Sequence, residues 1–165
     1  MDDNGKVTEK DIEEIATTAT AMMDGITTLA NVKGISREEL ESIYQIGYSY
    51  YETGKFDEAE KIFNFLVLFD HVNNKYWTAF GAARQAKKNF KGAYEAYAAA
   101  ALYDLHAPKP HLYAAQCAFQ LGMLDEAESG CRSLLHYCPA GVEGNDPLRA
   151  KAEKLLKAVE LARQN

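Results

Sequence analysis

The strongest constraint on the fold of this chain is an internal repeat. The octapeptide TGKFDEAE at residues 53–60 returns as LGMLDEAE at residues 121–128. Midway between them, KKNFKGAYE at residues 87–95 keeps the same frame with different letters. The spacing between the two octapeptides is therefore two periods of 34 residues, and one structural unit is built three times.

Small and aromatic residues punctuate this period at fixed positions. Equivalent residues are Gly47, Gly81 and Ala115; Ala59, Ala93 and Ala127; and Phe56, Phe90 and Leu124. A 34-residue period with this punctuation is typical of the tetratricopeptide repeat, a helix–turn–helix unit. Three units tile without a gap at residues 40–73, 74–107 and 108–141. The sequence predicts an all-α protein in which three tandem repeats, within residues 36–141, form a right-handed superhelical array.

Elementary sterics explain the repeated glycines. We expect Gly47 and Gly81 where the two helices of a unit cross, because a larger side chain would push the helices apart. Gly54 and Gly122 suit the end of the first helix, where the backbone turns left-handed. Lys88 replaces glycine at that position in the middle repeat, so we expect this turn to be strained or differently closed.

Helical segments flank the repeats on both sides. Residues 1–35 form an N-terminal helical region, in which the apolar period predicts one helix over residues 8–31, ended by Gly34. Ser36 and Glu39 predict a capping box for the first repeat helix. The two end faces of a repeat array are apolar and require such caps.

The C-terminal residues 142–165 are predicted to form the second cap. Asp146 is the expected N-cap residue and Pro147 the first helical residue. Leucine and valine recur on one side of the following helix, with lysine and arginine on the other. This pattern predicts an amphipathic capping helix.

Charge and composition narrow the function. The net charge is −6, which disfavours direct nucleic-acid binding. No apolar run is long enough to insert in a membrane, and the acidic start MDDNGKVTEKDIEE is unlike an export signal. Cys117, Cys131 and Cys138 form no CxxC pair and match no zinc-site spacing, even with His136 beside them. We expect free thiols, a cytoplasmic location and no metal.

Catalytic motifs are also missing from the sequence. There is no glycine-rich phosphate loop, no GxSxG and no HExxH, and no histidine has a carboxylate at a telling spacing. We therefore expect a protein that is not an enzyme and has no cofactor.

The first repeat carries a second apolar stripe beside its packing face. Tyr44, Tyr48 and Tyr51 share one side of a helix at i, i+4 and i+7. They either pack under the N-terminal helix or wall a concave groove, where rigid rings give contact area at a low entropy cost. Equivalent positions in the later repeats are Thr78, Ala82, Gln85, Leu112, Gln116 and Phe119. Such a groove suits an extended peptide with spaced apolar anchors.

One well-known use of such a groove is disfavoured. Tetratricopeptide co-chaperones hold a chain-terminal carboxylate with Lys, Asn and Arg at set positions. The matching residues here are Tyr44, Tyr48, Ala79, Lys109 and Tyr113. Only Lys109 keeps the basic character, so capture of an acidic C-terminus is not expected.

Longer motifs resemble one bacterial family. The run IYQIGYSYYETGKFDEAEKIFNFLVLFD at residues 43–70 is similar to the first repeat of the class II chaperones of type III secretion systems. YWTAFGAARQAKKNFKGAYEAY at residues 76–97 resembles the family's second repeat, and PKPHLYAAQC at residues 108–117 resembles its PxPxxHxxxC stretch, with Tyr113 in place of histidine. TLANVKGIS at residues 28–36 resembles the segment that enters the first repeat.

The resemblance implies a cytoplasmic chaperone that binds hydrophobic translocator proteins and keeps them soluble and separate before secretion. A segment near the translocator's N-terminus would lie extended in the concave groove. The groove residues implied by position are Tyr44, Tyr48, Tyr51, Phe65, Leu66, Tyr76, Ala82, Gln85, Leu112 and Gln116. The resemblance also implies a homodimer formed through residues 1–35, and a transcription regulator as a further partner. The alternative is a generic tetratricopeptide scaffold that joins soluble proteins.

Overall fold

The structure is a computed structural model that describes residues 8–164. The elements are α1 (Glu9–Met23), α2 (Leu29–Lys33), α3 (Arg37–Glu52), α4 (Phe56–Phe69), α5 (Asn74–Ala86), α6 (Phe90–Tyr103), α7 (Pro108–Gln120), α8 (Leu124–Tyr137) and α9 (Asn145–Ala162). No strand occurs between residues 8 and 164. The prediction of an all-α fold is confirmed.

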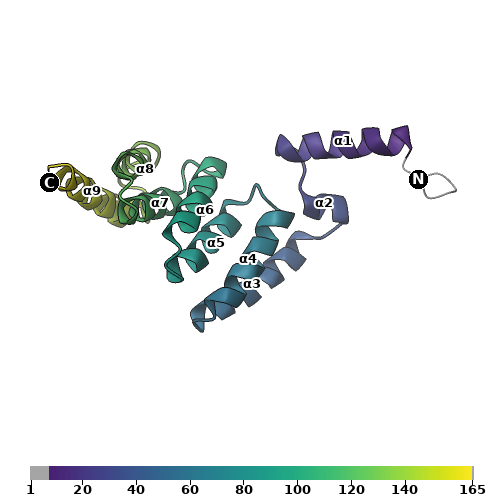
Figure 1. The fold of residues 1–165 in the computed structure, drawn as a ribbon, viewed down its shortest axis with the longest axis horizontal. Helices are drawn as coiled ribbons and strands as arrows, with labels where there is room; N and C mark the ends of the chain where they lie inside the picture. The colour runs from purple at the N-terminus through teal and green to yellow at the C-terminus, as the bar shows by residue number, and fades with distance from the viewer. Residues whose placement is uncertain (1–7, 165) are drawn as a thin grey trace.

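Helices α3 to α9 stack in chain order along one axis (Figure 1). The pairs α3–α4, α5–α6 and α7–α8 pack within themselves and against the next pair, and α9 packs on α7 and α8. The second helix of each pair begins at Phe56, Phe90 and Leu124, one period apart each time. Helices α1 and α9 therefore lie at opposite ends of an elongated arrangement of helices (Figure 1).

Helix ends follow the sequence chemistry in the repeats. The Ser36 hydroxyl accepts a hydrogen bond from the Glu39 N–H at 3.2 Å, and the Glu39 carboxylate accepts one from the Ser36 N–H at 2.8 Å. This is the predicted capping box. Gly54 and Gly122 adopt left-handed φ angles of 75° and 73°, and Lys88 adopts the same conformation at 62°. The middle turn therefore closes like the others, with a lysine where glycine is favoured.

Replacing Lys88 with glycine is expected to stabilise the protein by about 1 kcal/mol, because a side chain in the left-handed region costs about 1–2 kcal/mol. For a chain of this size the melting temperature should rise by about 2–4 °C. Thermal unfolding followed by circular dichroism measures this. The matched control is Lys61→Gly on the exposed side of α4, which should destabilise by about 1 kcal/mol. Equal changes in melting temperature for Lys88→Gly and Lys61→Gly would show that the backbone at Lys88 is not strained.

The glycines at the helix crossings have no room for a side chain. A Cβ atom at Gly47 would lie 2.8 Å from the Phe63 ring, and one at Gly81 would lie 2.8 Å from the Tyr97 ring. Both aromatic residues belong to the second helix of the same repeat. The small residue and the ring fit together, and this contact sets the crossing of α3 with α4 and of α5 with α6.

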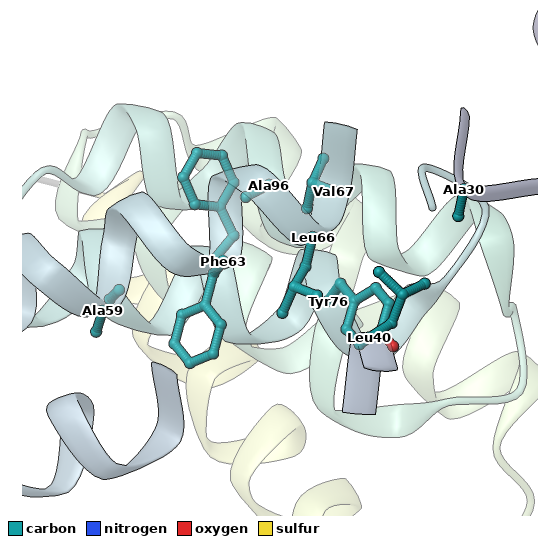
Figure 2. Packing of buried hydrophobic residues seen from close by; sticks show 10 residues of the cluster. Ala30, Leu40, Ala59, Phe63, Leu66, Val67, Tyr76 and Ala96 are labelled. Carbon is teal, nitrogen blue, oxygen red and sulfur yellow. The ribbon is translucent and has the colours of Figure 1, made fainter. Parts of the chain in front are cut away.

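The first repeat has a continuous apolar core (Figure 2). Phe63 and Leu66 of α4 are at most 1% exposed, and Leu40 and Tyr76 pack against them from α3 and α5. Full burial of a side chain such as Leu66 stabilises the fold by roughly 1.5–3 kcal/mol. Because Tyr76 comes from the second repeat, this core also ties the two repeats together.

Charged residues also connect the first and second repeats at the surface. Glu60 of α4 accepts hydrogen bonds from Arg84 and Lys87 at the end of α5, at 3.0 and 2.7 Å. Burial alone would raise the pKa of the Glu60 carboxyl, but the bonds from Lys87 and Arg84 outweigh it and lower the pKa. The ionised form of Glu60 is therefore the one that the fold favours.

The prediction of one helix over residues 8–31 is wrong. The chain breaks between α1 and α2, where Gly25 takes a φ of 69° and packs beside Val72. Helix α1 lies away from the repeat array (Figure 1) and buries none of its side chains fully. Its end is fastened by a 2.8 Å hydrogen bond between the Met22 carbonyl and the His71 ring. Ile12 and Ile15 remain 58% and 63% exposed, so the apolar face of α1 is uncovered in the single chain.

The start of the C-terminal helix also differs from the prediction. Gly144, with a φ of 80°, is the N-cap of α9, and Asp146 lies inside the first turn. The Asp146 carboxylate accepts a hydrogen bond from the Gly141 N–H at 2.9 Å and so closes the preceding loop. Pro147 is the third helical residue, where its missing N–H again costs no intrahelical hydrogen bond.

Candidate peptide-binding groove

A groove of about 630 Å³ runs along the first helices of the three repeats. Its lining comes from α3, α4, α5, α7, the start of α9 and the residues just before α7 and α9. The lining residues are Tyr44, Tyr48, Tyr51, Phe63, Asn74, Lys75, Thr78, Ala79, Ala82, Ala107, Pro108, Lys109, Pro110, Tyr113, Glu143, Gly144, Asn145 and Leu148. Most of the lining surface belongs to carbon atoms. Helices α3, α5 and α7 are the first helices of successive pairs in the stack, so the groove follows the long axis of the array.

Three tyrosines of α3 wall one end of the groove. The rings of Tyr44 and Tyr48 stack with centroids 6.3 Å apart, and Tyr44 also contacts Phe63 at 5.7 Å. Tyr48 is 43% exposed, whereas Tyr44 is half-buried. Burial, with the charge of Glu41 next, raises the pKa of Tyr44, and a hydrogen bond to Glu52 raises the pKa of Tyr48. Both phenols are neutral at pH 7 and offer an apolar ring with a polar tip.

This arrangement distinguishes the two interpretations of the tyrosine stripe, namely packing beneath the N-terminal helix or forming a wall of the groove. Helix α1 contributes no residue to the groove lining, and the three tyrosines line the groove together. Tyr44 and Tyr51 also pack with their inner edges against the core of the first repeat. The stripe is therefore half core and half open surface, which favours the groove interpretation over packing beneath the N-terminal helix.

The middle of the groove is lined by small side chains and the far end by mixed ones. Thr78 and Ala82 of α5 leave the middle open, and Pro110 and Tyr113 of α7 wall the far end. Leu148 of α9 closes that end. An extended segment would thus meet aromatic rings first, then open space, then a proline–tyrosine–leucine wall.

Four of the ten predicted groove residues, Tyr44, Tyr48, Tyr51 and Ala82, lie in the lining. Leu66, Tyr76 and Leu112 do not, since they are at most 2% exposed. They belong to the core and support the walls from behind. Because these three side chains are buried, the prediction that they contact a peptide in the groove is corrected.

The remaining three predicted residues lie outside the lining as well. Phe65 faces the core from α4 and stacks on Phe69 with centroids 4.2 Å apart. The Gln85 side chain accepts a hydrogen bond from the Tyr97 hydroxyl at 2.8 Å, so it is engaged within its own repeat. Gln116 is half-buried on α7.

Packing of the C-terminal helix explains why the groove is lined by different positions in the third repeat. Leu112 is equivalent to Tyr44 and Thr78 by the 34-residue period, yet it lies in a core cluster with Ala152 of α9. Helix α9 packs on α7 and covers this position. The groove wall passes instead to Tyr113, one residue further along, and to Leu148.

Sequence reasoning missed several lining residues that it could have found. Ala79, Lys109 and Tyr113 match the positions compared above with the carboxylate-binding tetratricopeptide co-chaperones, and all three line this groove. Lys75 precedes Lys109 by one period. Glu143 follows Lys109 by one more period, whereas Gly144 and Asn145 had no such signal, because their place depends on how α9 packs.

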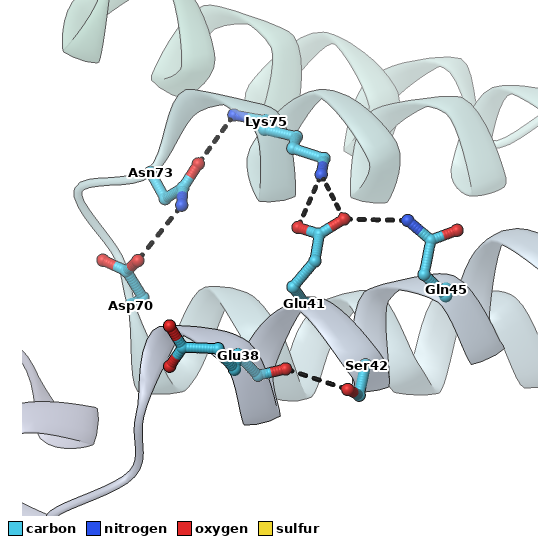
Figure 3. Close-up of polar contacts among 7 residues, drawn as sticks. All are labelled: Glu38, Glu41, Ser42, Gln45, Asp70, Asn73 and Lys75. Carbon is cyan, nitrogen blue, oxygen red and sulfur yellow. Dashed lines mark hydrogen bonds and ion pairs between the residues drawn. The ribbon is translucent and has the colours of Figure 1, made fainter.

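Lys75 is held in place by neighbouring groups (Figure 3). Its ammonium donates to both carboxylate oxygens of Glu41, at 2.9 and 2.7 Å, and Gln45 donates to the same carboxylate at 2.8 Å. The ammonium also lies 3.8 Å from the centre of the Tyr44 ring, a cation–π contact. The bond from Lys75, and then that from Gln45, lower the pKa of Glu41.

The cysteines lie in the interior of the fold. Cys117, Cys131 and Cys138 are unpaired and buried, and burial raises the pKa of Cys117 and of Cys131 to about 11. The thiols therefore stay protonated at neutral pH and act as small apolar groups. In the stretch from Thr8 to Gln164, none of the helices has the length and apolar character needed to cross a membrane.

Three helical pairs of repeat length, stacked around one open groove, define the chain as a tetratricopeptide-repeat protein. A family model described as tetratricopeptide repeat matches residues 40–73. Chaperone protein SicA of Salmonella typhimurium is 32% identical over 98% of this chain and 93% of its own length. Low calcium response locus protein H of Yersinia pestis is 29% identical over 93% of this chain and 91% of its own.

Solved structures give the same family. A type III secretion complex from Aeromonas hydrophila has a TM-score of 0.81 at 35% identity and covers 90% of this chain and 98% of that one. PcrH, known from Pseudomonas aeruginosa, was solved with the chaperone-binding region of PopD; it has a TM-score of 0.72 at 38% identity, covering 80% and 98%. The chain belongs to the class II chaperones of type III secretion systems.

Proposed function

We propose that this protein is a translocator chaperone of a type III secretion system. It acts in the bacterial cytoplasm, without catalysis, and binds an extended segment of a hydrophobic translocator in its groove. The observation that carries the proposal is the groove itself, an open channel of about 630 Å³ walled by Tyr44, Tyr48 and Tyr113. Covering apolar client surface keeps the translocators soluble and separate before secretion.

Relatives support the choice of client. PcrH was solved with the chaperone-binding regions of PopD and PopB, and SycD of Yersinia enterocolitica with a peptide of the translocator YopD. These relatives are 31–38% identical to this chain. A translocator segment therefore accounts for the groove better than a scaffold role between soluble proteins.

The same proposal includes a homodimer formed through the N-terminal region. Ile12 and Ile15 of α1, and Ile26 in the bend that follows it, are each more than half exposed. Apolar side chains exposed in a segment that is held by few contacts are stabilised by a partner surface. SycD, a relative, was solved in an alternative dimer form. A transcription regulator as a further partner stays a prediction of the family resemblance.

A groove-filling substitution tests the proposed function. Ala82→Phe adds a ring in the open middle of the groove and removes no core contact, so the fold should persist. Titration calorimetry with synthetic PopD and PopB chaperone-binding regions should show binding to the wild type and a loss of at least about tenfold in the variant. The control is Ala150→Phe on the exposed side of α9. Equal binding by Ala82→Phe and the wild type would contradict the proposal.

A further inference from the structure

One row of charged residues follows the groove at the repeat period. Glu41, Lys75, Lys109 and Glu143 are spaced 34 residues apart, and the last three line the groove. Along the path of a bound segment, the row therefore has two basic residues in the middle and one acidic residue at each end. These three charged residues line the same groove as the apolar walls, so a bound segment contacts charged and apolar side chains together.

Only one of the two lysines is neutralised by the protein. Glu41 gives both carboxylate oxygens to Lys75. The Lys109 ammonium has no ion pair and no hydrogen bond within residues 8–164, and the first turn of α7 contains no acidic residue. Glu143 lines the same groove but lies beyond ion-pair distance of Lys109. The groove therefore has an uncompensated positive charge at the start of α7, although the whole chain carries a net charge of −6.

A bound segment changes the surroundings of this charge. An apolar segment that fills the groove displaces water near Lys109, and a charge that loses water without gaining a partner weakens binding. A carboxylate on the segment restores the lost interaction. Lys75 illustrates this pairing within the protein, since its ammonium binds a carboxylate while lying over an aromatic wall.

We propose that Lys109 selects client segments that carry an acidic side chain, Asp or Glu, beside their apolar anchors. This inference rests on the proposed function and specifies its client. It differs from capture of a chain terminus, because one internal carboxylate needs one cation rather than a full clamp. Glu143 at the far end repels a second acid and so restricts where the first can lie.

The test is a charge swap between groove and peptide. The probes are synthetic PopD and PopB chaperone-binding regions in which each position in turn is Asp, Asn or Lys, measured against the wild type and Lys109→Glu. At one position we expect Asp to bind the wild type about three- to tenfold more tightly than Lys does, with the order reversed in Lys109→Glu. The preference should shrink in 1 M salt, where the Debye length is about 3 Å.

The matched control is Lys91→Glu, the same charge reversal at an exposed position of α6 outside the groove, which should keep the wild-type profile. Lys109 makes no contact that the fold needs, so melting temperatures of both variants should match the wild type. If peptides bind but no position reverses in Lys109→Glu, the inference is overturned and the proposed function stands. If no peptide binds the wild type, both fail.

Discussion

Replacing Tyr44 and Tyr48 together with alanine is expected to weaken binding of the PopD chaperone-binding region by about 100-fold or more. Buried aromatic side chains are common binding hot spots, and each costs about 2 kcal/mol or more when truncated. The two rings stack on each other at one end of the groove, so the double variant removes two of the three tyrosines that form that wall. Titration calorimetry on the purified protein measures the loss.

The controls separate binding from folding. Tyr44 contacts Phe63 and Tyr76 of the core, with ring centroids 5.7 and 6.0 Å away, so its loss also lowers stability. Tyr48→Ala alone should weaken binding about tenfold or more at an unchanged melting temperature. Tyr103→Ala is its matched control, because Tyr103 is 44% exposed and lies on α6, outside the groove. Equal losses for Tyr48→Ala and Tyr103→Ala would rule out a specific aromatic wall.

Gly81→Leu is expected to destabilise the protein by about 3 kcal/mol and to loosen the middle repeat. The first added atom alone would lie 2.8 Å from the Tyr97 ring, which is 1% exposed and has no free space to enter. Overpacking of a dense interior typically costs 1–3 kcal/mol, and this substitution adds four carbon atoms at a helix crossing. Urea unfolding followed by circular dichroism gives the free energy of unfolding.

A graded pair of variants makes the test sharper. Gly81→Ala should destabilise less than Gly81→Leu, because the Tyr97 ring has only one methyl group to avoid. Ala150→Leu adds side-chain bulk on the exposed side of α9 and should change stability by less than about 0.5 kcal/mol. A wild-type unfolding curve for Gly81→Leu would show that α5 and α6 do not cross at this residue.

Local chemistry explains why several elements were predictable. The Ser36–Glu39 capping box and the left-handed turns at Gly54 and Gly122 depend on residues within four positions of each other. The period that places Gly47 and Gly81 at helix crossings is likewise read directly along the chain. The place of the α3 tyrosines in the groove was predictable because a helix with two apolar faces cannot bury both of them against one neighbouring helix.

Other features depend on contacts between distant segments. The break between α1 and α2 places Gly25 beside Val72, and α1 is fastened by the His71 ring, more than forty residues away. Periodicity within residues 8–31 contains no trace of these contacts. Tyr76 and Leu66 carry the same apolar character as groove residues, and only their partners reveal that they are core.

The sequence by itself determined the repeat, its register and the aromatic stripe, because a 34-residue period and a 3.6-residue helix are properties of one dimension. The tertiary structure decided where the groove ends. Helix α9 covers Leu112 and leaves Tyr113 and Leu148 as the wall. Glu41 pairs with Lys75, whereas Lys109 forms no ion pair within residues 8–164. The physical reason is that burial and ion pairing belong to surfaces that meet in space, and no spacing along the chain specifies which surfaces meet.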